Sequence, residues 1–99
     1  MDRRVIWSEP ALNDLKAAAE FIARDSPRYA SVFVGRVRDA ARSLAWMHER
    51  GRRVPEVEDP NVRELFVSRY RLIYEVAGGA VYILAFVHGA RDLEALWRQ

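Results

Sequence analysis

Four side chains in the second half of the chain have the chemistry needed to handle a phosphate group: Arg63, Arg71, His88 and Arg91. An arginine binds phosphate through planar, bidentate hydrogen bonds, and a histidine can carry a proton near neutral pH. Together such groups could cleave RNA by stabilising the phosphorane while protons move. Arg71 can instead pair with Glu64 or Glu75 across the expected sheet, and we favour this structural interpretation of Arg71.

Other kinds of chemical site are not expected. The chain has no cysteine, which excludes disulfides, thiol catalysis and a cysteine-ligated zinc site. His48 and His88 are the only histidines, and no spacing typical of metal ligands accompanies them. The glycines are scattered, so no phosphate-binding loop is indicated, and no nucleophile, base and orienting acid stand at a telling spacing. We therefore expect neither a cofactor nor a metal.

Length and composition limit the class of protein. With 99 residues we expect one domain, residues 1–99, and the longest apolar run, residues 80–87, is too short to span a membrane. The 16 basic and 14 acidic residues lack the basic stripe typical of nucleic-acid-binding proteins, so no direct sequence-specific nucleic-acid binding is expected. The absence of cysteine and of a signal peptide predicts a cytoplasmic protein.

The elements that must position these side chains are two helices and four strands. Ser8 and Ser26 are typical helix N-caps, because each precedes a proline in the first turn and then an apolar stripe. The first helix should end near Asp25 and the second near His48. Strands are expected at residues 4–7, 62–67, 70–76 and 80–87, and a short C-terminal helix at residues 92–97.

This order, β-α-α-β-β-β with a short C-terminal helix, predicts an α+β fold in which a largely antiparallel sheet packs against a helical hairpin. Within strand 70–76, Tyr70, Leu72 and Tyr74 share one face, and Arg71 and Ile73 share the other. One face should meet the helices and the other should be at least partly wet. Residues 49–61 are expected to be a loop whose acids, Glu56, Glu58 and Asp59, are solvated and neutralised by neighbouring arginines.

Several motifs in order resemble the ParE/RelE superfamily of bacterial toxins, which includes the plasmid stabilisation proteins. The resemblance covers nearly the whole chain, and its fold agrees with the one predicted above. The matching segments are residues 7–15 (WSEPALNDL), 21–23 (FIA), 26–30 (SPRYA), 51–56 (GRRVPE), 63–65 (REL), 70–74 (YRLIY) and 88–93 (HGARDL).

The resemblance implies one of two toxic activities, each controlled by a cognate antitoxin. RelE-like members are ribosome-dependent mRNA endonucleases, whereas ParE-like members inhibit DNA gyrase by binding and are not enzymes. RelE-like nucleases carry two basic residues, one position apart, on the strand before the Tyr-Arg motif. Arg63 matches the first, but the second falls on Leu65, which cannot transfer a proton. The nearest match to the position of their C-terminal acid–base group is Leu96, with Trp97 and His88 as alternatives.

We therefore favour a ParE-like toxin of a type II toxin–antitoxin system that binds DNA gyrase. Tryptophan and arginine are enriched at binding hot spots. The residues expected near the target are His88, Arg91, Asp92, Trp97 and Arg98. The alternative is a RelE-like nuclease. In it Arg63, Arg71 and Arg91 would hold the scissile phosphate, and His88 would carry the proton. A third hypothesis is a degenerate member that retains only antitoxin binding.

Overall fold

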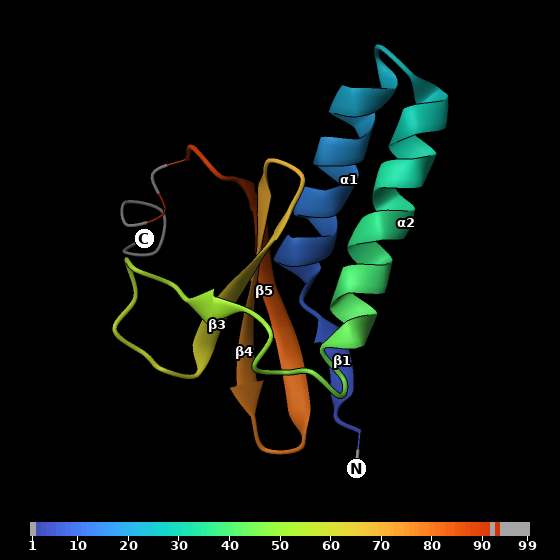
Figure 1. The fold of residues 1–99 in the computed structure, drawn as a ribbon. Helices are drawn as coiled ribbons and strands as arrows, with labels where there is room; N and C mark the ends of the chain where they lie inside the picture. Colours follow the sequence, from blue (N-terminus) through green and yellow to red (C-terminus); the bar gives the residue numbers. More distant parts are fainter. Residues whose placement is uncertain (1, 92, 94–99) are drawn as a thin grey trace.

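The computed structural model describes residues 2–91 and 93, and its elements follow the expected order with one addition (Figure 1). The C-terminal helix expected at residues 92–97 lies, except for Leu93, outside the described residues. The elements are β1 (Arg4–Trp7), α1 (Glu9–Ala23), α2 (Pro27–Ser43), β2 (Arg52–Arg53), β3 (Val62–Val67), β4 (Tyr70–Ala77) and β5 (Ala80–His88).

Both helices begin where the serine and proline pattern predicted. The Ser8 hydroxyl accepts a hydrogen bond from the Ala11 N–H and the Ser26 hydroxyl accepts one from the Tyr29 N–H. The prediction that the second helix reaches His48 is wrong, because α2 ends at Ser43. The amides of Leu44, Ala45 and Trp46 bond three residues back instead of four, which tightens the chain into a turn. The Ala45 carbonyl in this turn then accepts a hydrogen bond from the Arg3 N–H beside β1.

The sheet has five strands in the order β1-β5-β4-β3-β2. The antiparallel pairing predicted for the second half of the chain is confirmed, whereas β1 joins β5 in parallel, so the sheet as a whole is mixed. The two-residue strand β2 lies within the segment that we expected to be only a loop. It pairs with β3, placing Arg52 opposite Glu64.

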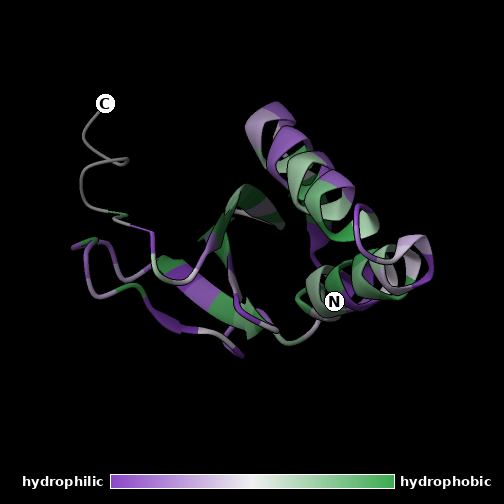
Figure 2. Cartoon of the chain, turned by 90° about the horizontal axis from the view of Figure 1, so that it is seen from above, coloured by the Kyte–Doolittle hydropathy of each residue, from purple (hydrophilic) through white to green (hydrophobic). Residues whose placement is uncertain are grey.

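The helical hairpin covers one face of the sheet, as the alternation on β4 predicted (Figures 1 and 2). Leu72 and Tyr74 on this face pack with Phe33 and Val37 of α2 in the main core. The opposite face is not wet at Arg71 and Ile73, contrary to our expectation. A second apolar cluster covers it, comprising Val54, Val62, Ile73, Val87 and Leu93.

Tyr74 ties the segment after α2 to the centre of the sheet. Its buried hydroxyl donates to the His48 carbonyl at 2.9 Å and accepts from the Gly51 N–H at 2.9 Å. This contact requires glycine at residue 51, because a Cβ there would lie 2.5 Å from the Glu64 carbonyl oxygen and 2.6 Å from the Tyr74 hydroxyl. The close approach sets where loop 49–61 begins its path across the outer face.

We expect Gly51→Ala to lower the free energy of unfolding by about 1–3 kcal/mol, because the backbone of β3 must move to admit the methyl group. Urea denaturation followed by circular dichroism measures the change. Gly35→Ala is the matched control: it lies on an exposed turn of α2 with open space around it, and should stabilise the chain by about 0.5–1 kcal/mol. Equal stability of the Gly51→Ala variant and the wild type would contradict the close approach.

Candidate functional site

Arg71 lies on the outer face of the sheet, where two carboxylates surround its guanidinium. Its Nε and Nη2 contact Glu64 Oε1, each at 2.7 Å. Its Nη1 and Nη2 donate to the two oxygens of Glu56 at 3.0 and 2.8 Å. Arg71 is 4% exposed and Glu64 is 1% exposed, so this ion pair is buried. The structural interpretation of Arg71 is confirmed, with Glu64 and Glu56 as partners instead of Glu75.

The loop acids do not all behave as predicted. Glu58 and Asp59 form no ion pair within residues 2–91 and 93, whereas Glu56 reaches back to Arg71. The expectation that Glu56 is only a solvated loop acid is therefore wrong, because its charge balances a buried cation. The hydrogen bonds from Arg71 hold the pKa of the Glu56 carboxyl below its ordinary value, and those same bonds raise the pKa of Arg71.

Arg63 lies on the other face of the sheet from Arg71. Its neighbours Leu65 and Val67 pack against the main core, while Glu64 belongs to the outer face. Opposite Arg63 on β4 is Tyr74, and the Arg63 Nη1 donates to the Gly51 carbonyl at 2.9 Å. The sheet thus separates the two arginines that a nuclease would need on one phosphate.

His88 lies at the end of β5, on the same side of the sheet as the helices. It pairs with Tyr70 across the strands and packs edge-on against the Tyr70 ring at a centroid distance of 5.5 Å. Along β4, Tyr70 and Tyr74 are four residues apart, or about 13 Å. His88 and Arg63 therefore lie beside distant positions of the central strand.

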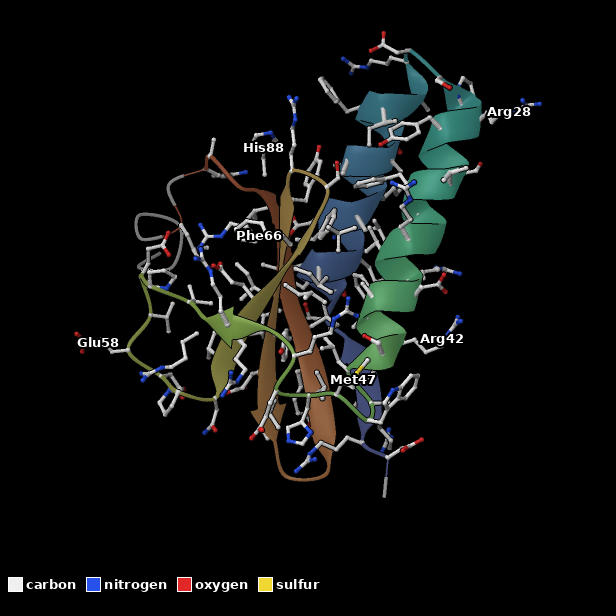
Figure 3. All side chains as sticks on the ribbon, viewed as in Figure 1. Arg28, Arg42, Met47, Glu58, Phe66 and His88 are labelled. Carbon is white, nitrogen blue, oxygen red and sulfur yellow. The ribbon has the colours of Figure 1, made fainter. Side chains whose placement is uncertain are left out.

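The structure does bring His88 and Arg91 together. Both are exposed, and both line a hollow of about 250 Å³ together with Asp14, Phe21 and Tyr70. Figure 3 shows His88 at the end of the sheet beside the tip of the hairpin. The other residues expected near the target, Asp92, Trp97 and Arg98, lie outside the described residues, as does Leu96.

Two exposed aromatic side chains at this end were missed by the sequence analysis. Phe21 is 63% exposed and Tyr29 is 44% exposed, and both line a second hollow of about 480 Å³ with His88 and Arg69. Phe21 lies next to the apolar stripe of α1 and not within it. This position was the sequence feature that could have identified it as an exposed aromatic residue. We name the surface formed by Phe21, Tyr29, Arg69, His88 and Arg91 the hairpin-tip surface.

Within residues 2–91 and 93, no group of three or more His, Asp or Glu residues is placed to hold a metal ion. Among the described residues, no helix has the length and apolarity to cross a membrane.

The architecture is that of the ParE/RelE-like toxins, a helical hairpin against a mixed sheet. A solved structure of a chromosomal ParDE toxin–antitoxin system from P. aeruginosa superposes with a TM-score of 0.72 at 22% identity, covering 87% of this chain and 95% of that one. The sequence model of the ParE toxin of type II toxin–antitoxin systems (parDE) matches residues 5–93. Toxin RelE2 of Caulobacter vibrioides is 39% identical over 89 residues, which are 89% of this chain and 97% of that protein. The chain belongs to the ParE toxin family of type II toxin–antitoxin systems.

We expect Arg71→Met to lower the free energy of unfolding by about 3 kcal/mol, because Glu64 stays buried with only Arg52 as partner. Guanidinium denaturation gives the value. The double variant Glu64→Leu, Arg71→Met should recover much of this loss, since it leaves no unpaired charge. Arg69→Met removes an exposed charge two residues away and should change stability little. Equal effects of Arg69→Met and Arg71→Met would contradict the buried pair.

A second prediction concerns pH. The folded pKa of Glu56 lies below its unfolded value, so its carboxylate stabilises the fold above about pH 4.3. This contribution is lost as the pH falls through the folded pKa. We expect Glu56→Gln to be less stable than the wild type at pH 7 and the difference to shrink below about pH 4. Thermal denaturation from pH 7 to pH 3 measures it, with Glu58→Gln as the charge-matched control; a difference that does not depend on pH would contradict the assignment.

Proposed function

We propose that this toxin inhibits DNA gyrase by binding, and that it breaks no covalent bond itself. Membership of a type II toxin–antitoxin family supports a toxin with an antitoxin partner. The observation that carries the finer proposal is the separation of the four candidate nuclease side chains. They occupy three places: Arg71 on the outer face, Arg63 near Tyr74 on the helix side, and His88 with Arg91 at the hairpin tip.

The ionisable side chains that contact Arg71 among the described residues are Glu56 and Glu64, and both carboxylates are occupied as partners of its guanidinium. The side chain one position beyond the first basic residue of β3 is Leu65, which packs against the apolar core. Arg71 cannot act as a general base because a guanidinium stays protonated. Its N–H groups, which would bind a phosphate, already donate to Glu56 and Glu64. Binding to a large protein partner requires neither proton transfer nor a free guanidinium at Arg71.

We place the gyrase contact at the hairpin-tip surface. Exposed Phe21 and Tyr29 can each bury an aromatic ring against a partner, and His88, Arg69 and Arg91 surround them. Aromatic side chains and arginine are enriched at protein interfaces. Asp92, Trp97 and Arg98, which the sequence suggests lie near the target, are outside the described residues, so their part in the proposal rests on the sequence alone. Because gyrase acts on DNA in the cytoplasm, we also propose a cytoplasmic location.

The antitoxin is proposed to bind the groove between the two helices, which shares no residue with the hairpin-tip surface. A groove of about 490 Å³ runs between the two helices, lined mainly by small and apolar side chains of both, among them Ala19, Ala23, Ala30 and Val34. Such a groove suits a helix laid along it by its apolar face.

The second candidate is a ribosome-dependent mRNA endonuclease. It is favoured by the name of the Caulobacter relative, Toxin RelE2, which is 39% identical to this chain. In this alternative, His88 and Arg91 would act together at the hairpin tip, while Arg63 and Arg71 would have to leave their observed partners.

The two candidates are separated by parallel assays of the purified chain. Incubated with gyrase, ATP and relaxed plasmid, the wild type should block supercoiling, and with programmed ribosomes it should leave mRNA intact. Phe21→Ser, His88→Ala and Arg91→Ala should each weaken gyrase inhibition by about tenfold or more, as expected for central interface side chains. Lys16→Ala in the interhelical groove is the control and should inhibit like the wild type. Cleaved mRNA with normal supercoiling would overturn the proposal.

A further inference from the structure

A cluster of hydrogen-bond donors lies at the end of the molecule opposite to the hairpin tip. Arg3, His48, Asn61 and Arg63 line a hollow of about 210 Å³ there, with Glu49 as the acid in its lining. The four donors come from the residue before β1, the turn after α2, the loop before β3 and β3 itself. In Figure 3, Met47, which precedes His48, lies at the end of the molecule remote from His88.

Both arginines in this hollow lack a carboxylate partner among the residues that the structure describes. Within residues 2–91 and 93, neither Arg3 nor Arg63 forms an ion pair, Glu49 included. The Nη1 of Arg63 donates to the Gly51 carbonyl, and its other N–H groups can donate to a bound anion. Arg3 spends Nη1 on the His48 ring, and its Nε is buried without a hydrogen-bond partner among the described residues. A buried N–H of a cation without an acceptor is costly, so an acceptor is expected.

His48 adds a donor to the same place. Its Nδ1 lies 3.0 Å from Arg3 Nη1, and because an arginine can only donate, Nδ1 must be the acceptor. The ring proton then sits on Nε2, where it is a donor. With His48 neutral, the formal charge of the lining, from Arg3, Arg63 and Glu49, is positive.

We propose that this hollow, the Arg3–Arg63 pocket, binds a phosphate-class oxyanion. A tetrahedral anion presents oxygens in several directions, so it can accept from donors that approach from separate segments, whereas a carboxylate presents two oxygens in one plane. The bound anion would join the start of β1 to the turn after α2 and to β3, and would stabilise the folded chain. The proposal does not depend on which large target the toxin attacks, and its test contains no gyrase.

The test is a titration of the purified full-length chain with inorganic phosphate, followed by amide and arginine side-chain NMR signals. We expect saturable shifts confined to Arg3, His48, Gly51, Asn61 and Arg63, and a rise in Tm of about 4 °C or more at saturation. Acetate at equal concentration should produce far smaller shifts. Shifts that do not saturate, that spread over the surface, or that acetate reproduces would overturn the proposal.

A matched pair of variants tests whether Arg3 holds the anion. Arg3→Gln should weaken phosphate binding by about tenfold or more, because it removes a charge-assisted contact. Arg4→Gln is the matched control, since Arg4 is the exposed neighbour with the same charge, and it should change the affinity by about twofold or less. Equal losses in the two variants would mean diffuse attraction and would overturn the pocket. If Arg3→Gln fails to fold, the titration of the wild type still decides.

Discussion

The ion pair between Arg71 and Glu64 lies beneath the loop on the outer face of the sheet, and much of the structure depends on it. A charged pair is stable in such a place only when every strong donor and acceptor is satisfied. Glu56 and Arg52 complete the set, and Glu56 does so by bringing loop 49–61 over β3 and β4. The loop in turn carries Val54 onto Ile73, where Leu93 also packs. The outer face therefore becomes a second core.

This constraint also shapes what the toxin can do. A guanidinium bound by two carboxylates cannot grip a substrate phosphate without breaking its own support. Of the other candidate cations, Arg63 and His88 both lie on the helix side of the sheet, but at opposite ends of β4, in the Arg3–Arg63 pocket and on the hairpin-tip surface. The proposed binding function accords with this separation, because catalysis needs groups that converge around one atom.

The ParDE structure from P. aeruginosa shares this fold at 22% identity, so the architecture tolerates extensive side-chain change. The relatives carry both ParE and RelE names, and the common scaffold does not distinguish their activities. In this chain Leu65 packs against the core, and Arg63 and His88 pair with residues 74 and 70 of β4. These are properties of side-chain placement on an otherwise common sheet.

Local patterns were enough to predict both helix starts, the strands of the second half and the helix-facing side of β4, because caps and period-two alternation act within a few residues. The pairing of Arg71 with Glu64 was also foreseeable, since the two occupy facing strands. Four features required the tertiary structure: the parallel partner of β1, the early end of α2, the contact between Glu56 and Arg71, and the burial of the outer face. Each depends on contacts between segments that are distant in sequence. The sequence showed which residues could bind phosphate or carry a proton. Only the tertiary structure showed that Arg63, Arg71 and His88 do not share a site, because their relative positions depend on strand pairing.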